Sequence, residues 1–351
     1  MTTDQHSPPR TPQKIILDCD PGHDDAIALL LAHGNPNLDL LAVTTVAGNQ
    51  TLEKVTANAR AVARVGNIHG IPFAAGASRP LLGPQLIPEE IHGDSGLDGP
   101  TLPTPNVELA STHAVNLIAE IIEAHAPGEV TLVPTGALTN IALFARMYPH
   151  LVERVGGVTL MGGGHHTGNM TPAAEFNILA DPEAAQIVFE EPWPVTMVGL
   201  DVTHQVLAVP ERLEQLKTVG TDVSQFVAEL IEFFGAAYMK ERHYPGPPMH
   251  DPLAVAAVAD PSVLRVVRAP VAVETQGAHA RGQTIVDLRR TWNAQGGGNS
   301  PSSLGIADDA EASDSIVPIP KHYVACDVDV ERFWSVLVDA LTRIGDTGFR
   351  E

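Results

Sequence analysis

The stretch Ile15-Ile16-Leu17-Asp18-Cys19-Asp20-Pro21-Gly22-His23-Asp24-Asp25 places four carboxylates where a buried strand passes into a helix. The apolar run 15–19 predicts a short strand, Pro21-Gly22 a turn, and the apolar run 26–31 a helix that begins just before it, at Asp24 and Asp25. The amides at a helix N-terminus favour negative charge by only about 0.3–1 kcal/mol per group. Crowded carboxylates therefore repel one another or take up protons unless a metal cation neutralises them.

The four carboxylates are too many for a helix cap alone, because a cap uses one acid. Neighbouring helix residues point about 100° apart, so we expect that Asp24 and Asp25 do not both reach one ion together with Asp20. One of the two would bind a metal while the other serves a neighbouring task.

Composition limits the class of protein. The chain has 351 residues, with 42 acidic against 21 basic side chains and a net charge of −21, which argues against nucleic acid and anionic membranes as partners. No apolar run reaches the roughly 18 residues that cross a bilayer. Cys19 and Cys326 are too few for a disulfide framework, and residues 1–13 carry no export signal, so we expect a cytoplasmic protein.

Strand-like and helix-like segments alternate along the chain. The strands are apolar throughout rather than alternating, which is typical of strands covered on both faces. This order predicts a single α/β domain with a doubly wound, mostly parallel sheet over 14–346, preceded by a disordered tail at 1–13 and carrying a surface insertion at 292–320. The expected strands are 14–20, 40–48, 130–134, 158–161, 195–202 and 324–329, and the expected helices 51–65, 111–125, 140–148, 181–190, 223–242, 253–258 and 330–344.

Polar or glycine-rich sequences follow several of the expected strands. Ligands of such sheets bind at the carboxyl ends of the strands, so these sequences indicate one shared site. Two further segments have the same polar character: 91–99, which reads Ile-His-Gly-Asp-Ser-Gly-Leu-Asp-Gly, and His250-Asp251-Pro252 before the helix 253–258. The post-strand segments are Ala47-Gly48-Asn49, Pro134-Thr135-Gly136, and Met161-Gly162-Gly163-Gly164 with Asn169 and Glu175-Phe176-Asn177 behind it.

These motifs, in this order, closely resemble the inosine-uridine-preferring nucleoside hydrolase family. The resemblance extends from about residue 15 to 344 and leaves out the insertion. It implies the doubly wound fold and hydrolysis of the N-glycosidic bond of a ribonucleoside, giving ribose and a free base. It also implies a homotetramer or homodimer and a role in nucleoside salvage.

The resemblance further implies a role for each matching residue. One Ca²⁺ ion would be held by Asp20, Asp25, Asp251 and the Thr135 carbonyl; hard oxygen ligands suit Ca²⁺, although Mg²⁺ fits the same ligand type. Asp20 would take a proton from a metal-bound water, and His250 would protonate the leaving base, with His92 as second choice. The ribose hydroxyls would be bound by Asp24, Asn49 and Asn177, the 5′ end by Asn169, Glu175 and the Met161 region, and Asp251 would face both metal and substrate.

The base pocket is less defined by the motifs. Phe234 and Tyr238 are four residues apart on one helical face, which is equally typical of core packing. In the family, a tyrosine at the Tyr238 position goes with acceptance of inosine as well as uridine, whereas Phe234 departs from the tyrosine of broad-specificity members. We therefore expect uridine as the preferred substrate, with inosine and cytidine secondary. His250 is expected to titrate near neutrality, and His23 to make a structural hydrogen bond.

Two other functions use similar residues. A metal-dependent phosphohydrolase needs a Lys or Arg for the phosphate, and neither 18–25 nor 169–177 contains one. A calcium-dependent nucleoside- or sugar-binding protein would use the same cradle without turnover, but it does not require a base and an acid at Asp20 and His250. A dinucleotide dehydrogenase is disfavoured because no G-x-G-x-x-G opens the first helix.

Overall fold

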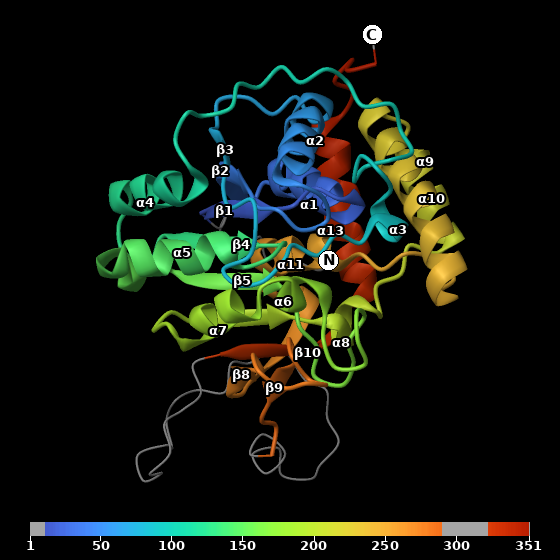
Figure 1. The fold of residues 1–351 in the computed structure, drawn as a ribbon. Helices are drawn as coiled ribbons and strands as arrows, with labels where there is room; N and C mark the ends of the chain where they lie inside the picture. The colour runs from blue at the N-terminus through green and yellow to red at the C-terminus, as the bar shows by residue number, and fades with distance from the viewer. Residues whose placement is uncertain (1–10, 290–321, 351) are drawn as a thin grey trace, which may run out of the picture.

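An eight-stranded sheet runs through the centre of the molecule in the order β3-β2-β1-β4-β5-β6-β10-β7 (Figure 1). The structure is a computed structural model that describes residues 11–289 and 322–350. All neighbouring strands are parallel except β7, which runs antiparallel to β10. The strands are β1 (Gln13–Cys19), β2 (Leu38–Thr45), β3 (Phe73–Ala75), β4 (Val130–Pro134), β5 (Gly157–Met161), β6 (Val195–Val198), β7 (Leu264–Arg268) and β10 (Tyr323–Val328), and a separate hairpin is formed by β8 (Val271–Val273) and β9 (Thr284–Val286).

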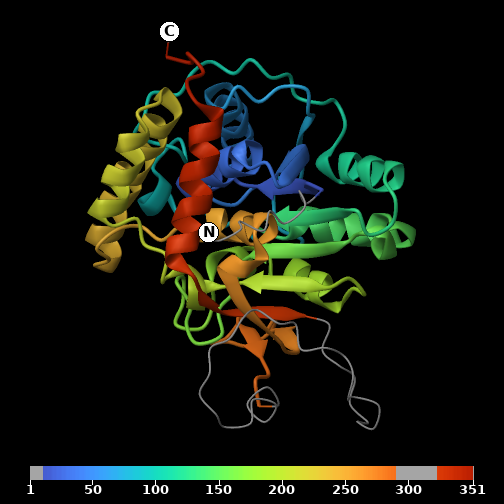
Figure 2. The ribbon, with the colours of Figure 1, turned by 180° about the vertical axis from the view of Figure 1, so that it is seen from behind.

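Helices cover both faces of this sheet, so the doubly wound, mostly parallel α/β fold is confirmed. One face is covered by α1 (His23–Gly34), α2 (Leu52–Val65), α9 (Pro210–Val219), α10 (Asp222–Arg242), α11 (His250–Ala259) and α13 (Val330–Ile344). The other is covered by α4 (Ala114–Ala124), α5 (Thr139–Met147), η1 (Pro149–Arg154) and α7 (Pro182–Glu190). The short α3 (Glu89–His92), α6 (Phe176–Ala180), α8 (Leu200–Thr203) and η2 (Pro261–Val263) complete the described elements. Figure 2 shows α13 crossing the back of the molecule.

The residues of β1 explain why both faces are covered. Ile15, Leu17 and Cys19 point into one apolar cluster, whereas Ile16 points into the other, and all four are fully buried. Successive strand residues face opposite sides of a sheet, so an apolar run needs a hydrophobic layer on each side.

The structure corrects some predicted boundaries. The strand predicted over 195–202 ends at Val198, and Leu200 already begins α8. Strand and helix are both buried here, and a short apolar run does not reveal where one becomes the other. The strand β1 starts at Gln13, inside the predicted tail. Residues 1–10 and the whole insertion predicted at 292–320 lie outside the described residues.

Candidate active site

The carboxyl ends of the central strands align at one edge of the sheet. Asp18, near the end of β1, lies beside Thr44 of β2 and Pro134 of β4. The residues that follow these strands therefore meet, as the sequence predicts, and the first residues of α11 join them. A single pocket is lined by Asp24, Asn49, His92, Thr135, Met161, Asn169, Glu175, Asn177, Phe234, Tyr238, His250 and Asp251 from among the predicted residues.

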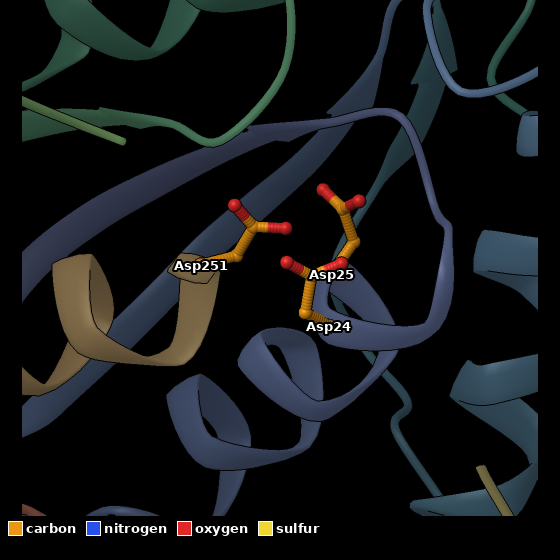
Figure 3. Close-up of side chains that lie close together, drawn as sticks. All are labelled: Asp24, Asp25 and Asp251. Carbon is orange, nitrogen blue, oxygen red and sulfur yellow. The ribbon is translucent and has the colours of Figure 1, made fainter. Parts of the chain in front are cut away.

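Three aspartates lie close together, and two of them, Asp24 and Asp251, line this pocket. Asp24, Asp25 and Asp251 are buried, and each offers a carboxylate oxygen within 4.8 Å of the others. Figure 3 shows Asp24 and Asp25 reaching from the first turn of α1 toward Asp251 at the start of α11. The converging oxygens belong to Asp24, Asp25 and Asp251 and not to Asp20, so the expectation that Asp24 and Asp25 do not both reach one ion together with Asp20 stays a prediction.

Asp20 lies next to this cluster, since its backbone N–H donates to Asp25 Oδ1 at 3.3 Å, and it is fully buried. Its Oδ2 accepts a hydrogen bond from the Asn49 backbone N–H at 2.6 Å, but its Oδ1 has no partner among the described residues. A buried carboxylate oxygen without a partner is costly, so it points to a ligand. The hard oxygen donors of the cluster and the unpartnered oxygen together fit a cation.

Asp25 and the two asparagines form a network that fixes the cluster. Asp25 Oδ1 accepts from the Thr135 hydroxyl at 2.8 Å, and its Oδ2 accepts from the Asn49 side-chain amide at 3.0 Å. The Asn177 amide donates to the backbone carbonyls of Thr135 and Met161 at 2.7 and 3.1 Å. The two asparagines therefore tie the strand ends to one another.

Burial and mutual repulsion perturb these carboxyl groups. Burial, and then the charge of Asp25, raises the pKa of Asp20 well above its usual value; burial, and then the charge of Asp24, does the same for Asp251. Burial raises the pKa of Asp24 to about 7. The pocket lining contains no Lys or Arg among the described residues, so the charge of the cluster is balanced by bound protons or by a bound cation.

Glu175 and Asn169 order the loop at the far side of the pocket. Glu175 caps α6, and its carboxylate accepts from the backbone N–H groups of Asn177, Ile178 and Gly163 at 2.8, 3.1 and 2.9 Å. Burial nonetheless raises its pKa to about 7. Asn169 Oδ1 accepts from the Phe176 N–H at 2.9 Å. Both side chains line the pocket while they hold its wall in place.

An aromatic wall closes the opposite side. Phe234 and Tyr238 of α10 are buried and also line the pocket, so the two alternatives left open by their spacing both hold. Tyr238 Oη lies 3.1 Å from His250 Nε2, and His250 Nδ1 lies 2.8 Å from the Thr203 hydroxyl. Burial lowers the pKa of His250 well below its usual value. The expectation that His250 titrates near neutrality is therefore wrong for this structure, because the ring is buried and lies beside His204.

The same wall contains residues that the sequence did not indicate. One of them is His204, at the end of α8. Its ring centroid lies 5.6 Å from that of His250, and its Nδ1 lies 3.3 Å from Tyr244 Oη. Thr203 and His204 were not predicted because the strand was expected to continue to residue 202. The strand in fact ends at Val198, so both residues follow a strand, as other site residues do. His23 makes the expected structural hydrogen bond, from Nε2 to the Asp98 carbonyl at 2.7 Å, and burial lowers its pKa to about 4.

The fold and the pocket define a class of protein: a doubly wound α/β enzyme with a buried acidic cluster and an aromatic wall, suited to a small ring compound that carries no negative charge. No helix among the described residues is long and apolar enough to cross a membrane. Residues 15–335 match the family described as inosine-uridine preferring nucleoside hydrolase, and the chain belongs to this family.

Relatives of known function support the assignment. The chain is 47% identical over 339 residues to the inosine-uridine preferring nucleoside hydrolase of Crithidia fasciculata, and the aligned region covers 95% of this chain and 99% of that protein. It is 48% identical over 275 residues to the pyrimidine-specific ribonucleoside hydrolase RihA of Photobacterium profundum, with 78% and 88% covered. The solved structure of a purine-preferring ribonucleoside hydrolase from Gardnerella vaginalis superimposes with a TM-score of 0.82 at 30% identity, with 95% and 99% covered. The protein is a ribonucleoside hydrolase, which cleaves the N-glycosidic bond.

Proposed function

We propose that this hydrolase depends on calcium and prefers uridine, with inosine and cytidine as secondary substrates. It would serve nucleoside salvage in the cytoplasm, as a homotetramer or a homodimer. The observation that carries the metal proposal is the buried acidic cluster, together with the unpartnered Oδ1 of Asp20. The names of the inosine-uridine-preferring and pyrimidine-specific relatives support the choice of bases.

Asp20, Asp25, Asp251 and the Thr135 carbonyl would hold the cation. When bound, Ca²⁺ supplies a water of lowered pKa and positive charge to offset the carboxylates. The Thr135 carbonyl already lies in the network, since it accepts from the Asn177 amide.

Asp20 is the proposed general base. Its Oδ2 is held by the Asn49 N–H, and its unpartnered Oδ1 would face the cation and the attacking water, which places the carboxylate to take a proton from that water. Burial and the charge of Asp25 raise the pKa of this carboxyl, and a bound cation would offset that charge and keep Asp20 ionised, as a general base must be.

Asp24, Asn49 and Asn177 would bind the ribose 2′- and 3′-hydroxyls, and Asn169, Glu175 and Met161 the 5′ end. Positive charge develops on the sugar as the bond to the base breaks. The buried carboxylates stabilise that charge, since no Lys or Arg opposes them in the described pocket lining.

His250 and Tyr238 would act on the departing base. In their 3.1 Å hydrogen bond, a proton on His250 Nε2 would donate to Tyr238 Oη, and the Tyr238 hydroxyl proton would then point toward a base nitrogen or oxygen. Because burial keeps the His250 ring neutral, its contribution is a polarising hydrogen bond rather than an imidazolium proton. Phe234 supplies a flat apolar surface beside them.

Ribose release from uridine, inosine, cytidine and adenosine tests the proposal. The enzyme is assayed as purified, after chelation, and after Ca²⁺ or Mg²⁺ is added back, beside Asp20→Asn and the exposed control Asp327→Asn. We expect Ca²⁺ to restore release, uridine to be cleaved fastest, and only Asp20→Asn to abolish activity. A calcium-loaded enzyme that binds uridine without releasing ribose would instead support the binding-protein alternative, and release of phosphate from uridine 5′-phosphate would support the phosphohydrolase.

A further inference from the structure

Two buried histidines share one hydrogen bond beside the pocket. His23 Nδ1 and His92 Nδ1 lie 3.2 Å apart, although the residues are far apart in sequence. The His23 ring is fully buried and stacks on Phe233 and Phe234 with ring centroids 5.2 Å away. His92 also stacks on Phe234, at 5.3 Å.

The protons of this pair follow from its partners. His23 Nε2 lies 2.7 Å from the Asp98 carbonyl oxygen, which only accepts, so Nε2 carries a proton. A neutral His23, as expected for a ring buried against two phenyl groups, then has a lone pair at Nδ1. His92 must donate from its own Nδ1 to fill the 3.2 Å bond, which leaves a lone pair at His92 Nε2.

His92 Nε2 is open to the pocket. His92 is one of the pocket-lining residues. Its Nε2 has no hydrogen-bond partner among the described residues. It is also absent from the polar atoms that are both fully buried and without a partner, so it remains accessible from the pocket. The free lone pair is therefore available to a substrate on the side of the pocket that carries the aromatic wall.

We propose that His23 is a positioning residue that holds His92 in the tautomer protonated at Nδ1, so that His92 Nε2 accepts a hydrogen bond from the N–H edge of the base and selects bases that carry one. This inference rests on the proposed function. Uracil has a donor at N3 and hypoxanthine at N1, whereas cytosine and adenine have lone pairs at these positions. Two lone pairs face each other when cytosine or adenine binds, and such a mismatch at one neutral hydrogen bond costs roughly tenfold in kcat/KM.

The same tautomer separates the two histidines of the site by role. In this state His92 has no proton at Nε2 to give to a leaving base. The polarising hydrogen bond to the leaving group is thus left to His250 and Tyr238, and His92 reads the base instead.

Nitrogen NMR of the wild-type enzyme tests the tautomer directly, and a variant is needed only to assign the signals. In two-bond ¹H–¹⁵N spectra of the histidine-labelled enzyme, protonated and unprotonated ring nitrogens have well-separated shifts, and His92→Gln assigns the His92 signals. We expect His92 to be protonated at Nδ1 and unprotonated at Nε2. A His92 signal protonated at Nε2 would overturn the proposal.

Substrate selectivity tests the consequence. His23→Phe keeps the aromatic stack but removes the acceptor for His92 Nδ1, and the exposed His33 on the same helix gives the control His33→Gln. We expect the ratio of kcat/KM for uridine over cytidine to fall about tenfold in His23→Phe and to stay unchanged in His33→Gln, with inosine over adenosine following the same trend. Circular dichroism checks that each variant folds. We also expect His92→Gln to lower the uridine-to-cytidine ratio, because the glutamine amide can either donate or accept a hydrogen bond and so does not select for a base N–H.

The two proposals fail in different ways. If no nucleoside releases ribose in the wild-type enzyme, the proposed function fails. If ribose is released but the uridine-to-cytidine ratio is unchanged in both His23→Phe and His92→Gln, the selectivity inference fails while the hydrolase remains.

Discussion

Gly136 sets the position of the proposed general base, and Gly136→Ala should disturb it. A Cβ atom added at Gly136 would lie 2.4 Å from Asp20 Oδ1, whereas real Cβ atoms essentially never come closer than 3.0 Å to another heavy atom. The carboxylate or the strand end must therefore retreat by at least 0.6 Å, the difference between the two distances. Asp20 has little freedom to do so, because the Asn49 N–H holds its Oδ2 at 2.6 Å and the side chain is fully buried.

A displacement of this size should affect turnover more than stability. A misplacement of about 1 Å at a reacting group costs on the order of 10²-fold in rate, whereas overpacking one methyl group costs about 1–3 kcal/mol. Steady-state ribose release from uridine and urea unfolding measure the two effects separately. Gly157→Ala is the matched control, because a Cβ there meets Pro194 at an ordinary 3.4 Å.

We expect Gly136→Ala to lower kcat about 100-fold and Gly157→Ala to leave it unchanged. If Gly136→Ala folds and retains wild-type kcat, then Asp20 either moves without consequence or does not act as the base, and the reasoning about its confinement is refuted.

Three further predictions follow from the site. Burial raises the pKa of Glu175 to about 7 from 4.5, so its contribution to stability is complete below about pH 4.5 and is lost as the pH rises through 7. In urea unfolding between pH 4.5 and 8, Glu175→Gln should therefore remove about 3 kcal/mol from the pH dependence of the free energy of unfolding. A pH profile that the substitution leaves unaltered would contradict this assignment. Tyr238→Phe removes the hydrogen bond to His250 and should lower kcat for uridine about tenfold with little change in KM, in contrast to a purely packing role, which would lower stability instead. Chelation should lower the melting temperature, and Ca²⁺ at about 100 times its Kd should restore about 2.7 kcal/mol of stability; scanning calorimetry with and without Ca²⁺ decides this, and equal melting temperatures would count against the metal site.

The sequence predicted the interior of the fold because apolar runs report burial directly. The runs that became β1, β4 and β5 are mostly apolar, and helices cover them on both faces of the sheet. The three-residue strand β3 and the antiparallel edge strand β7 were not predicted, because short and partly exposed strands carry little periodic signal.

The site was predicted as a set of residues but not as a set of protonation states. The strand-end rule brings together Asn49 and Thr135, and the start of α11 adds Asp251; the motifs had indicated all three. The low pKa of His250 depends on water being excluded by its neighbours and on His204, and no local pattern reports either. The pairing of His23 with His92 likewise joins segments whose contact exists only in the folded chain.

The position of the last strand affects how the enzyme forms during synthesis. β10 lies between β6 and β7, and α13 packs behind α1, where a Cβ added at Gly34 would come 2.4 Å from the Ala340 carbonyl oxygen. The helix that carries Asp24 and Asp25 is thus supported by residues made some 300 positions later. A ribosome-bound chain that stops before β10 should expose an unfilled gap in the sheet, recruit chaperones and show no activity, until release of the C-terminal helix lets the acidic cluster assemble.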